Sequence, residues 1–137
     1  MAPELADGVV LDTDVASRIL RDKLTGPLRT RLLGRVWCVT FVSVAELWKW
    51  AELRSWGPDR RAELESWLAD VTVLPSDDQV SRTWAQISAG AVRRGRPRPA
   101  NDTWIAAGCI ARGLPLATLN TKDFADFAEH DGLTLLQ

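Results

Sequence analysis

Short apolar runs alternate with longer amphipathic stretches along this chain. Five runs are apolar over nearly their whole length, a pattern typical of strands that are buried on both faces of a parallel sheet. These runs are residues 8–12, 36–41, 71–75, 114–119 and 133–137. The stretches between them carry apolar residues at helical spacing, for example Val15, Ile19 and Leu20. The alternation predicts an α/β fold.

Glycine and proline mark the ends of the predicted helices. Gly26-Pro27 and Gly57-Pro58 interrupt the pattern, and other predicted helices end on a glycine. The resulting helices are residues 13–23, 28–34, 43–56, 59–70, 77–95, 101–113 and 121–130. With about five parallel strands they predict a three-layer α/β/α sandwich, formed as a single domain over residues 1–137. In such sheets, functional crevices lie at the carboxyl ends of the strands.

Composition narrows the possible functions. The 137 residues carry a formal net charge of −1, so no overall basic field attracts nucleic acid. One histidine, His130, leaves little for a histidine metal site or a Ser/His/Asp triad. The N-terminus resembles no signal peptide and no run is long enough to span a membrane, so we expect a cytoplasmic protein. Cys38 and Cys109 are then expected as buried free thiols.

Four acidic residues stand at the starts of predicted helices or the end of a strand. Asp12 ends the first strand, Glu46 and Asp123 follow the second and fourth strands, and Asp102 opens a helix. The carboxyl ends of parallel strands meet at one edge, so three of these acids should come together there. Asp102 lies between two helices, and periodicity alone does not place it.

Each acid also has a purely structural interpretation. Ser43-x-x-Glu46 has the spacing of a capping box, Asn120-x-x-Asp123 has the same spacing, and Asn101-Asp102 suits a helix start. Asp12 could cap the first helix. Capping and a shared site do not exclude each other. Clustered carboxylates repel, however, and an oxygen-only set favours a hard cation such as Mg²⁺ or Mn²⁺.

Three segments carry a family resemblance over nearly the whole chain: VVLDTDVASRIL, VTFVSVAELWKWA and PRPANDTWIAAGCIARGLPLATLNTKDF. In their order and spacing they resemble the PIN-domain ribonucleases of the VapC toxin type. The resemblance implies a PIN-like fold in which four acids bind Mg²⁺ or Mn²⁺. The matching positions are Asp12, Glu46, Asp102 and Asp123, with a supporting polar pair at Thr118 and Asn120. Asp14 departs from the family, which commonly has asparagine there, and we interpret it as a helix cap rather than a metal ligand.

The implied activity is metal-dependent hydrolysis of RNA by the toxin of a toxin–antitoxin pair. Asp12 and Asp102 would be the central metal ligands, and Glu46 and Asp123 would complete the site. The family also implies a homodimer and a small antitoxin lying in an apolar groove. Trp48 is a candidate for that groove, as is Trp50. Their segment could equally be buried between the sheet and a neighbouring helix.

The densest basic stretch lies just ahead of Asp102. It contains Arg93, Arg94, Arg96 and Arg98, which are candidates for RNA phosphate contacts. The alternative is a basic helix end followed by a solvated loop.

Two other functions fit part of the sequence. The D-x-D of Asp12 and Asp14 also suits a haloacid-dehalogenase-type phosphotransferase, with Asp12 as nucleophile, but Lys122 is then the only plausible catalytic lysine. The second is a PIN-like scaffold without catalysis, although all four acid positions are filled here.

Overall fold

A five-stranded parallel sheet forms the centre of the molecule. The computed structural model describes residues 7–136, and the sheet order is β3-β2-β1-β4-β5. The strands are β1 (Gly8–Leu11), β2 (Val36–Thr40), β3 (Thr72–Leu74), β4 (Leu116–Ala117) and β5 (Leu135–Leu136). The chain first builds β2 and β3 on one side of β1 and then crosses to β4 on the other. The topological switch point therefore lies between β1 and β4, where open α/β sheets place their ligands.

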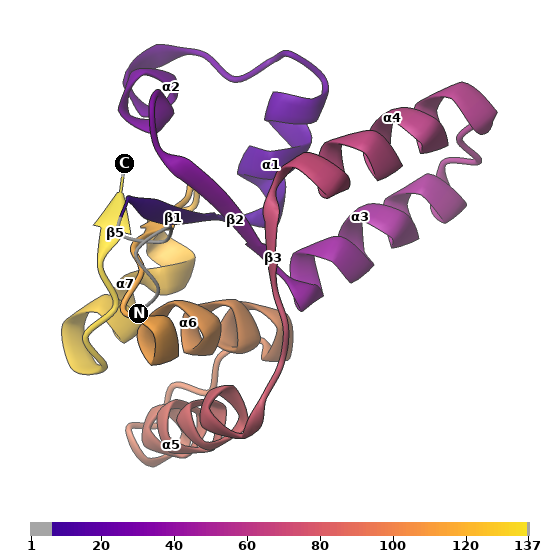
Figure 1. Ribbon diagram of the computed structural model, residues 1–137. Coiled ribbons are helices and arrows are strands. Elements are labelled where there is room, and N and C mark those ends of the chain that lie inside the picture. The colour runs from indigo at the N-terminus through magenta and orange to yellow at the C-terminus, as the bar shows by residue number, and fades with distance from the viewer. Residues whose placement is uncertain (1–6, 137) are drawn as a thin grey trace.

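Seven helices in the described chain cover the two faces of the sheet (Figure 1). One layer contains α1 (Thr13–Leu20), α2 (Gly26–Leu32), α3 (Phe41–Leu53) and α4 (Pro58–Asp70). The other contains α5 (Asp78–Arg93), α6 (Ala100–Arg112) and α7 (Thr121–His130). In Figure 1, α3 and α4 form an arm that extends beyond the sheet. The predicted three-layer sandwich is thus confirmed.

Alternation along the strands divides the interior into two apolar cores. Val10 of β1 packs with α5, α6 and α7, which contribute Ile87, Ile105 and Phe127 among others. Its neighbours Val9 and Leu11 point to the opposite face and pack with residues of α1 to α4. Because β1 is buried on both faces, its residues must all be apolar until the strand ends at Asp12.

Helix α6 is held close to the sheet by its small residues. A Cβ atom at Gly108 would lie 3.2 Å from Cγ2 of Thr40, so a larger side chain would press against the end of β2. The helix ends where predicted, at Gly113, whose φ of 66° is readily adopted only by glycine. This packing brings the first turn of α6 to the carboxyl edge of β1 and β2.

Some predicted boundaries were wrong. The second strand ends at Thr40, and α3 begins at Phe41 rather than at residue 43. The hydroxyl of Thr40 accepts a hydrogen bond from the Ser43 N–H, at 3.3 Å, so threonine caps this helix earlier than the pattern suggested. The fourth and fifth strands are also shorter than predicted, and Gln137 lies outside the described residues.

Both cysteines are buried free thiols, as predicted. Within residues 7–136, no helix has the length and apolar character needed to cross a bilayer.

Candidate functional site

The carboxylate of Asp12 lies at the end of the central strand, where the side chain is almost fully buried. One of its oxygens accepts a hydrogen bond from the Thr13 N–H at 2.8 Å, and the other accepts one from the Thr118 hydroxyl at 3.0 Å. Its own N–H donates to the Ala117 carbonyl at 2.9 Å. Asp12 is therefore fixed by the backbone of α1 on one side and by the end of β4 on the other.

Glu46 is tied to the residue that follows Asp12. The Thr13 hydroxyl donates to a Glu46 carboxylate oxygen at 2.8 Å and lies 2.8 Å from the Ser43 hydroxyl. A hydroxyl has one proton, so Thr13 accepts from Ser43 when it donates to Glu46. Thr13 and Ser43 are site residues that the sequence interpretation missed. The only sequence signal was their position, one directly after Asp12 and the other one helical turn before Glu46.

Asp102 and Asp123 lie in the first turns of α6 and α7. Asp102 is half-buried, whereas Asp123 is exposed. Asn120 precedes α7 and donates its N–H to the Thr118 hydroxyl at 3.0 Å, so it supports the residue that holds Asp12. Thr118 and Asn120 therefore lie at the Asp12 end of the site.

Electrostatic interactions link the four acids. Burial, followed by the charges of Asp102 and Glu46, raises the pKa of Asp12 to about 6, against the lowering effect of its hydrogen bonds. Burial also raises the pKa of Asp102, and the charges of Asp123 and Glu46 add to that rise. Arg98 acts in the opposite direction on Asp102. The carboxylates therefore share one electrostatic environment at the predicted edge.

The chemistry of these groups fits a hard divalent cation. All are oxygen donors, with the Thr118 hydroxyl beside them and no nitrogen or sulfur ligand in the set. Among residues 7–136, no three His, Cys, Asp or Glu side chains form a ready-made metal cluster. Binding an ion would offset both the burial and the mutual repulsion that raise the pKa of Asp12 and Asp102.

Capping explains only part of this arrangement. Asp12 is the N-cap of α1, as one of the two interpretations of this residue predicted. The predicted capping box at Ser43 and Glu46 was wrong, because Thr40 caps α3 and both residues face Thr13 instead. Pro99 occupies the cap position of α6, and Asn120 caps α7 without a side-chain hydrogen bond. Local capping therefore does not account for Glu46, Asp102 or Asp123.

Asp14 lies in the first turn of α1, where its carboxylate is 3.7 Å from the Arg18 guanidinium one turn later. The predicted capping role for Asp14 was wrong, since Asp12 is the cap. Its negative charge still suits the N-terminal end of the helix dipole. Asp14 is not among the charges that shift the pKa of Asp12.

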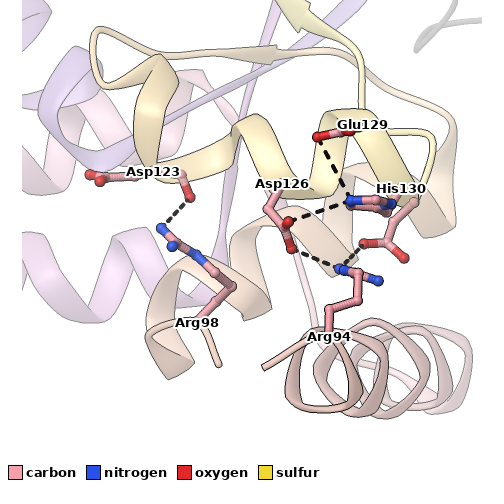
Figure 2. A network of polar contacts seen from close by, with 7 residues as sticks. Arg94, Arg98, Asp123, Asp126, Glu129 and His130 are labelled. Carbon is pink, nitrogen blue, oxygen red and sulfur yellow. Dashed lines mark hydrogen bonds and ion pairs between the residues drawn. The ribbon is translucent and has the colours of Figure 1, made fainter. Parts of the chain in front are cut away.

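The basic stretch divides into two kinds of arginine. Arg93 and Arg96 are exposed. Arg94 and Arg98 are half-buried and bind protein groups: Arg94 pairs with Asp126 at 2.7 Å, and Arg98 donates to the Asp123 carbonyl at 3.0 Å (Figure 2). The structure thus contradicts the interpretation of Arg94 as an RNA contact, because buried carboxylates already occupy its guanidinium.

Trp48 and Trp50 are half-buried and pack at the edge of the core that contains α1 to α4. The Arg54 guanidinium lies over the Trp50 ring, 5.4 Å from its centre. Two open hollows beside α1 and α4 are lined by other tryptophans, one by Trp56 and the other by Trp67. The sequence interpretation did not single out these two residues.

A shallow pocket of about 300 Å³ adjoins the acids. Glu46 is part of its wall, and Asn101 lies next to Asp102. Its aromatic residues are Phe41 and Trp104, whose rings meet edge to face at 5.8 Å. The pocket therefore continues the carboxylate site with aromatic and amide groups.

Comparison with known proteins identifies the class of fold and site. Residues 9–130 match the PIN domain. The tRNA(fMet)-specific endonuclease VapC of Shigella flexneri is 32% identical over 119 residues, which cover 84% of this chain and 88% of that protein. Ribonuclease VapC5 of Mycobacterium tuberculosis is 42% identical over 73 residues, but the match covers only half of its length.

Solved structures agree with these matches. The VapBC-5 complex of Mycobacterium tuberculosis contains a chain with 31% identity and a TM-score of 0.71, with 96% of this chain and 98% of that one covered. The DNA-bound VapBC complex of Salmonella typhimurium contains one with 26% identity and a TM-score of 0.80, covering 94% and 96%. The chain therefore belongs to the PIN-domain family. Within that family its relatives are VapC ribonucleases.

This membership removes the phosphotransferase alternative. The D-x-D resemblance depended on Asp14 as an acid or base and on Lys122. Asp14 pairs with Arg18, and Lys122 is exposed at the start of α7.

The raised pKa of Asp12 has a consequence for stability. The folded chain binds this proton more tightly than the unfolded chain, so the free energy of unfolding falls as the pH rises from about 4 to about 6. Without metal, we expect Asp12→Asn to stabilise the fold at pH 7 by on the order of 2–3 kcal/mol, since one pKa unit corresponds to about 1.4 kcal/mol. Asparagine can still accept a hydrogen bond through its side-chain oxygen.

Urea unfolding in EDTA at pH 7 and pH 3.5 measures this effect. The difference between the two proteins should become small at the lower pH, where Asp12 is mostly protonated in both states. An Asp12→Asn protein no more stable than wild type at pH 7 would contradict the electrostatic account.

Proposed function

We propose that this protein is a Mg²⁺- or Mn²⁺-dependent endoribonuclease that hydrolyses RNA phosphodiester bonds as the toxin of a toxin–antitoxin pair. The observation that carries the proposal is the shared electrostatic environment of Asp12, Glu46, Asp102 and Asp123 at the switch point of a PIN-domain sheet. The names of its VapC relatives support the choice of RNA.

In this proposal the metal ligands are the four acids. When bound, Mg²⁺ or Mn²⁺ supplies positive charge to the scissile phosphate and lowers the pKa of a water molecule. Asp12 and Asp102 are the central ligands in this proposal, since burial and the other acids raise the pKa of both. Thr118 and Thr13 orient Asp12 and Glu46 through the hydrogen bonds described above.

Loss of either central acid tests the activity. We expect Asp12→Asn and Asp102→Asn each to lower Mg²⁺-dependent cleavage of total cellular RNA by at least about 100-fold, more than typical changes to supporting residues. Mapping the ends should reveal 5′-phosphate and 3′-hydroxyl groups. Asp14→Asn is the matched control, since it removes a neighbouring carboxylate outside the site. Cleavage that survives either central substitution would refute the assignment.

RNA would bind next to the acids. Exposed Arg93 and Arg96 supply phosphate contacts near the start of α6, and the pocket beside Glu46 offers Phe41 and Trp104 to an unstacked base. Single-stranded RNA suits this arrangement because its bases are free to stack on aromatic side chains.

Salt dependence tests the exposed arginines. Arg93→Gln combined with Arg96→Gln should weaken RNA binding and reduce the slope of log K against log salt by about 0.7 for each phosphate that the protein no longer neutralises. Mn²⁺ affinity should stay unchanged. Arg31→Gln is the control, because α2 leads into the N-terminal end of β2, whereas the acids follow the carboxyl ends of the strands. An unchanged slope in the double variant would exclude these two arginines from the RNA site.

We also propose a small antitoxin as partner, a homodimer as the assembly and the cytoplasm as the location. Structural neighbours that are VapBC complexes support the partner. The tryptophan-rich surface of the α3–α4 arm supplies apolar area for it, both at Trp48 and Trp50 and in the hollow lined by Trp67.

Tryptophan emission distinguishes these surfaces. Adding the cognate antitoxin should shift the emission of the wild-type chain. If Trp48 and Trp50 form the contact, Trp48→Phe/Trp50→Phe should abolish most of the shift, and Trp67→Phe should retain it. The reverse result would move the contact to the hollow between α1 and α4.

The remaining alternative is a PIN-like scaffold that binds without cleaving. Titration with Mn²⁺ separates the two functions, because a scaffold needs no metal at the acids. Absence of Mn²⁺ binding in the wild type would favour the scaffold.

A further inference from the structure

Two arginines connect the segment ahead of α6 to α7. Arg94, at the end of α5, reaches Asp126 in the middle of α7, and Arg98 reaches the backbone at Asp123 in its first turn. Figure 2 shows both side chains approaching α7 from the same side. The residues between them form the loop that leads directly into the first turn of α6, where Asp102 lies. Two of the four acids are therefore carried by elements that these arginines join.

The Arg94 contact is the stronger of the two. Its guanidinium nitrogen lies 2.7 Å from one Asp126 oxygen and 3.6 Å from the Asp131 carboxylate, and these carboxylates are 8% and 15% exposed. The hydrogen bond from Arg94 lowers the pKa of Asp126, so this acid is held in its charged form. His130 lies 3.7 Å from the other Asp126 oxygen. A buried ion pair of this kind defines one geometry, because separation would leave a carboxylate without its partner.

Apolar packing alone does not fix the orientation of α7. Phe124 and Phe127 anchor the helix in the core, but apolar contacts are non-directional. Asp126 lies three residues after Asp123, so both side chains project from neighbouring positions on the helix. Holding Asp126 and the Asp123 backbone at once therefore fixes both the rotation and the height of the turn that carries Asp123.

We infer that Arg94 and Arg98 are positioning residues that set the spacing between the Asp102 and Asp123 carboxylates for a divalent cation. Asp102 and Asp123 repel, and the pair must be held mechanically before an ion neutralises it. Arg98 also places its positive charge within reach of Asp102, which offsets part of that repulsion. The inference rests on the metal site of the proposed function, but neither arginine would touch the ion.

The most direct variant is Arg94→Lys, which keeps the charge but removes the planar group that contacts two carboxylates. We expect about 10-fold weaker Mn²⁺ binding by electron paramagnetic resonance, the usual scale for residues behind metal ligands. kcat for RNA should fall while KM stays the same. Arg82→Lys is the matched control, since Arg82 is exposed on the same helix and pairs with Asp78 one turn earlier. Wild-type Mn²⁺ affinity in Arg94→Lys would overturn the inference.

A second variant guards against a simple loss of folding. Arg94→Met/Asp126→Asn/Asp131→Asn removes the guanidinium and both carboxylates that it contacts, so neither acid is left without its partner. We expect this protein to unfold near the wild-type midpoint and still to bind Mn²⁺ about 10-fold more weakly, on the same scale. Wild-type affinity in this folded protein would also overturn the inference.

A readout without metal separates this inference from the proposed function. Hydrogen exchange at the backbone amides of residues 120–125 should be faster in Arg94→Lys and in Arg98→Met than in the control Arg82→Lys. If wild type binds no Mn²⁺, the proposed metal site is wrong. Faster exchange would then still show that Arg94 and Arg98 hold α7 in place. Equal exchange in all three variants would exclude this role.

Discussion

The arrangement of this protein depends on one buried carboxylate at the end of its central strand. Asp12 receives a hydrogen bond from the backbone of α1 and another from Thr118 after β4, so the two sides of the switch point meet on its oxygens. Burial opposes its charge and raises its pKa to about 6. The fold therefore holds this group against an electrostatic cost, which is common at sites tuned for function rather than stability.

The other acids reach the same edge by different structural means. Glu46 is oriented by the hydroxyl of Thr13, whereas Asp123 depends on a helix that is held by arginines from the preceding segment. Asp102 lies at the start of a helix that packs closely on the sheet through Gly108. Each carboxylate is thus supported by a separate set of contacts, and the four are brought together only by the folded sheet.

The alternation of apolar runs with helical stretches predicted the sheet and its layers. Because parallel strands have one common carboxyl edge, the positions of Asp12, Glu46 and Asp123 after their strands predicted that these three acids lie at that edge. Periodicity could not place Asp102, which enters from a helix-to-helix connection, and only the family resemblance did so. The Thr13–Ser43–Glu46 contacts were also out of reach, since they join residues 30 and 33 positions apart. The density of arginines in the sequence could not show that Arg93 is exposed while Arg94 forms ion pairs. The partners of Arg94 lie far along the chain, in α7 and just after it.

The hydroxyl of Thr13 has only one proton to donate, and the two neighbouring side chains decide which of them receives it. With Glu46 charged, the proton points to the acid and the Ser43 proton points to Thr13, so the three side chains form an ordered relay. Valine would match the shape of Thr13 and break this relay without removing any carboxylate. The orientation of Glu46 therefore depends on an uncharged residue that directly follows Asp12 in the chain.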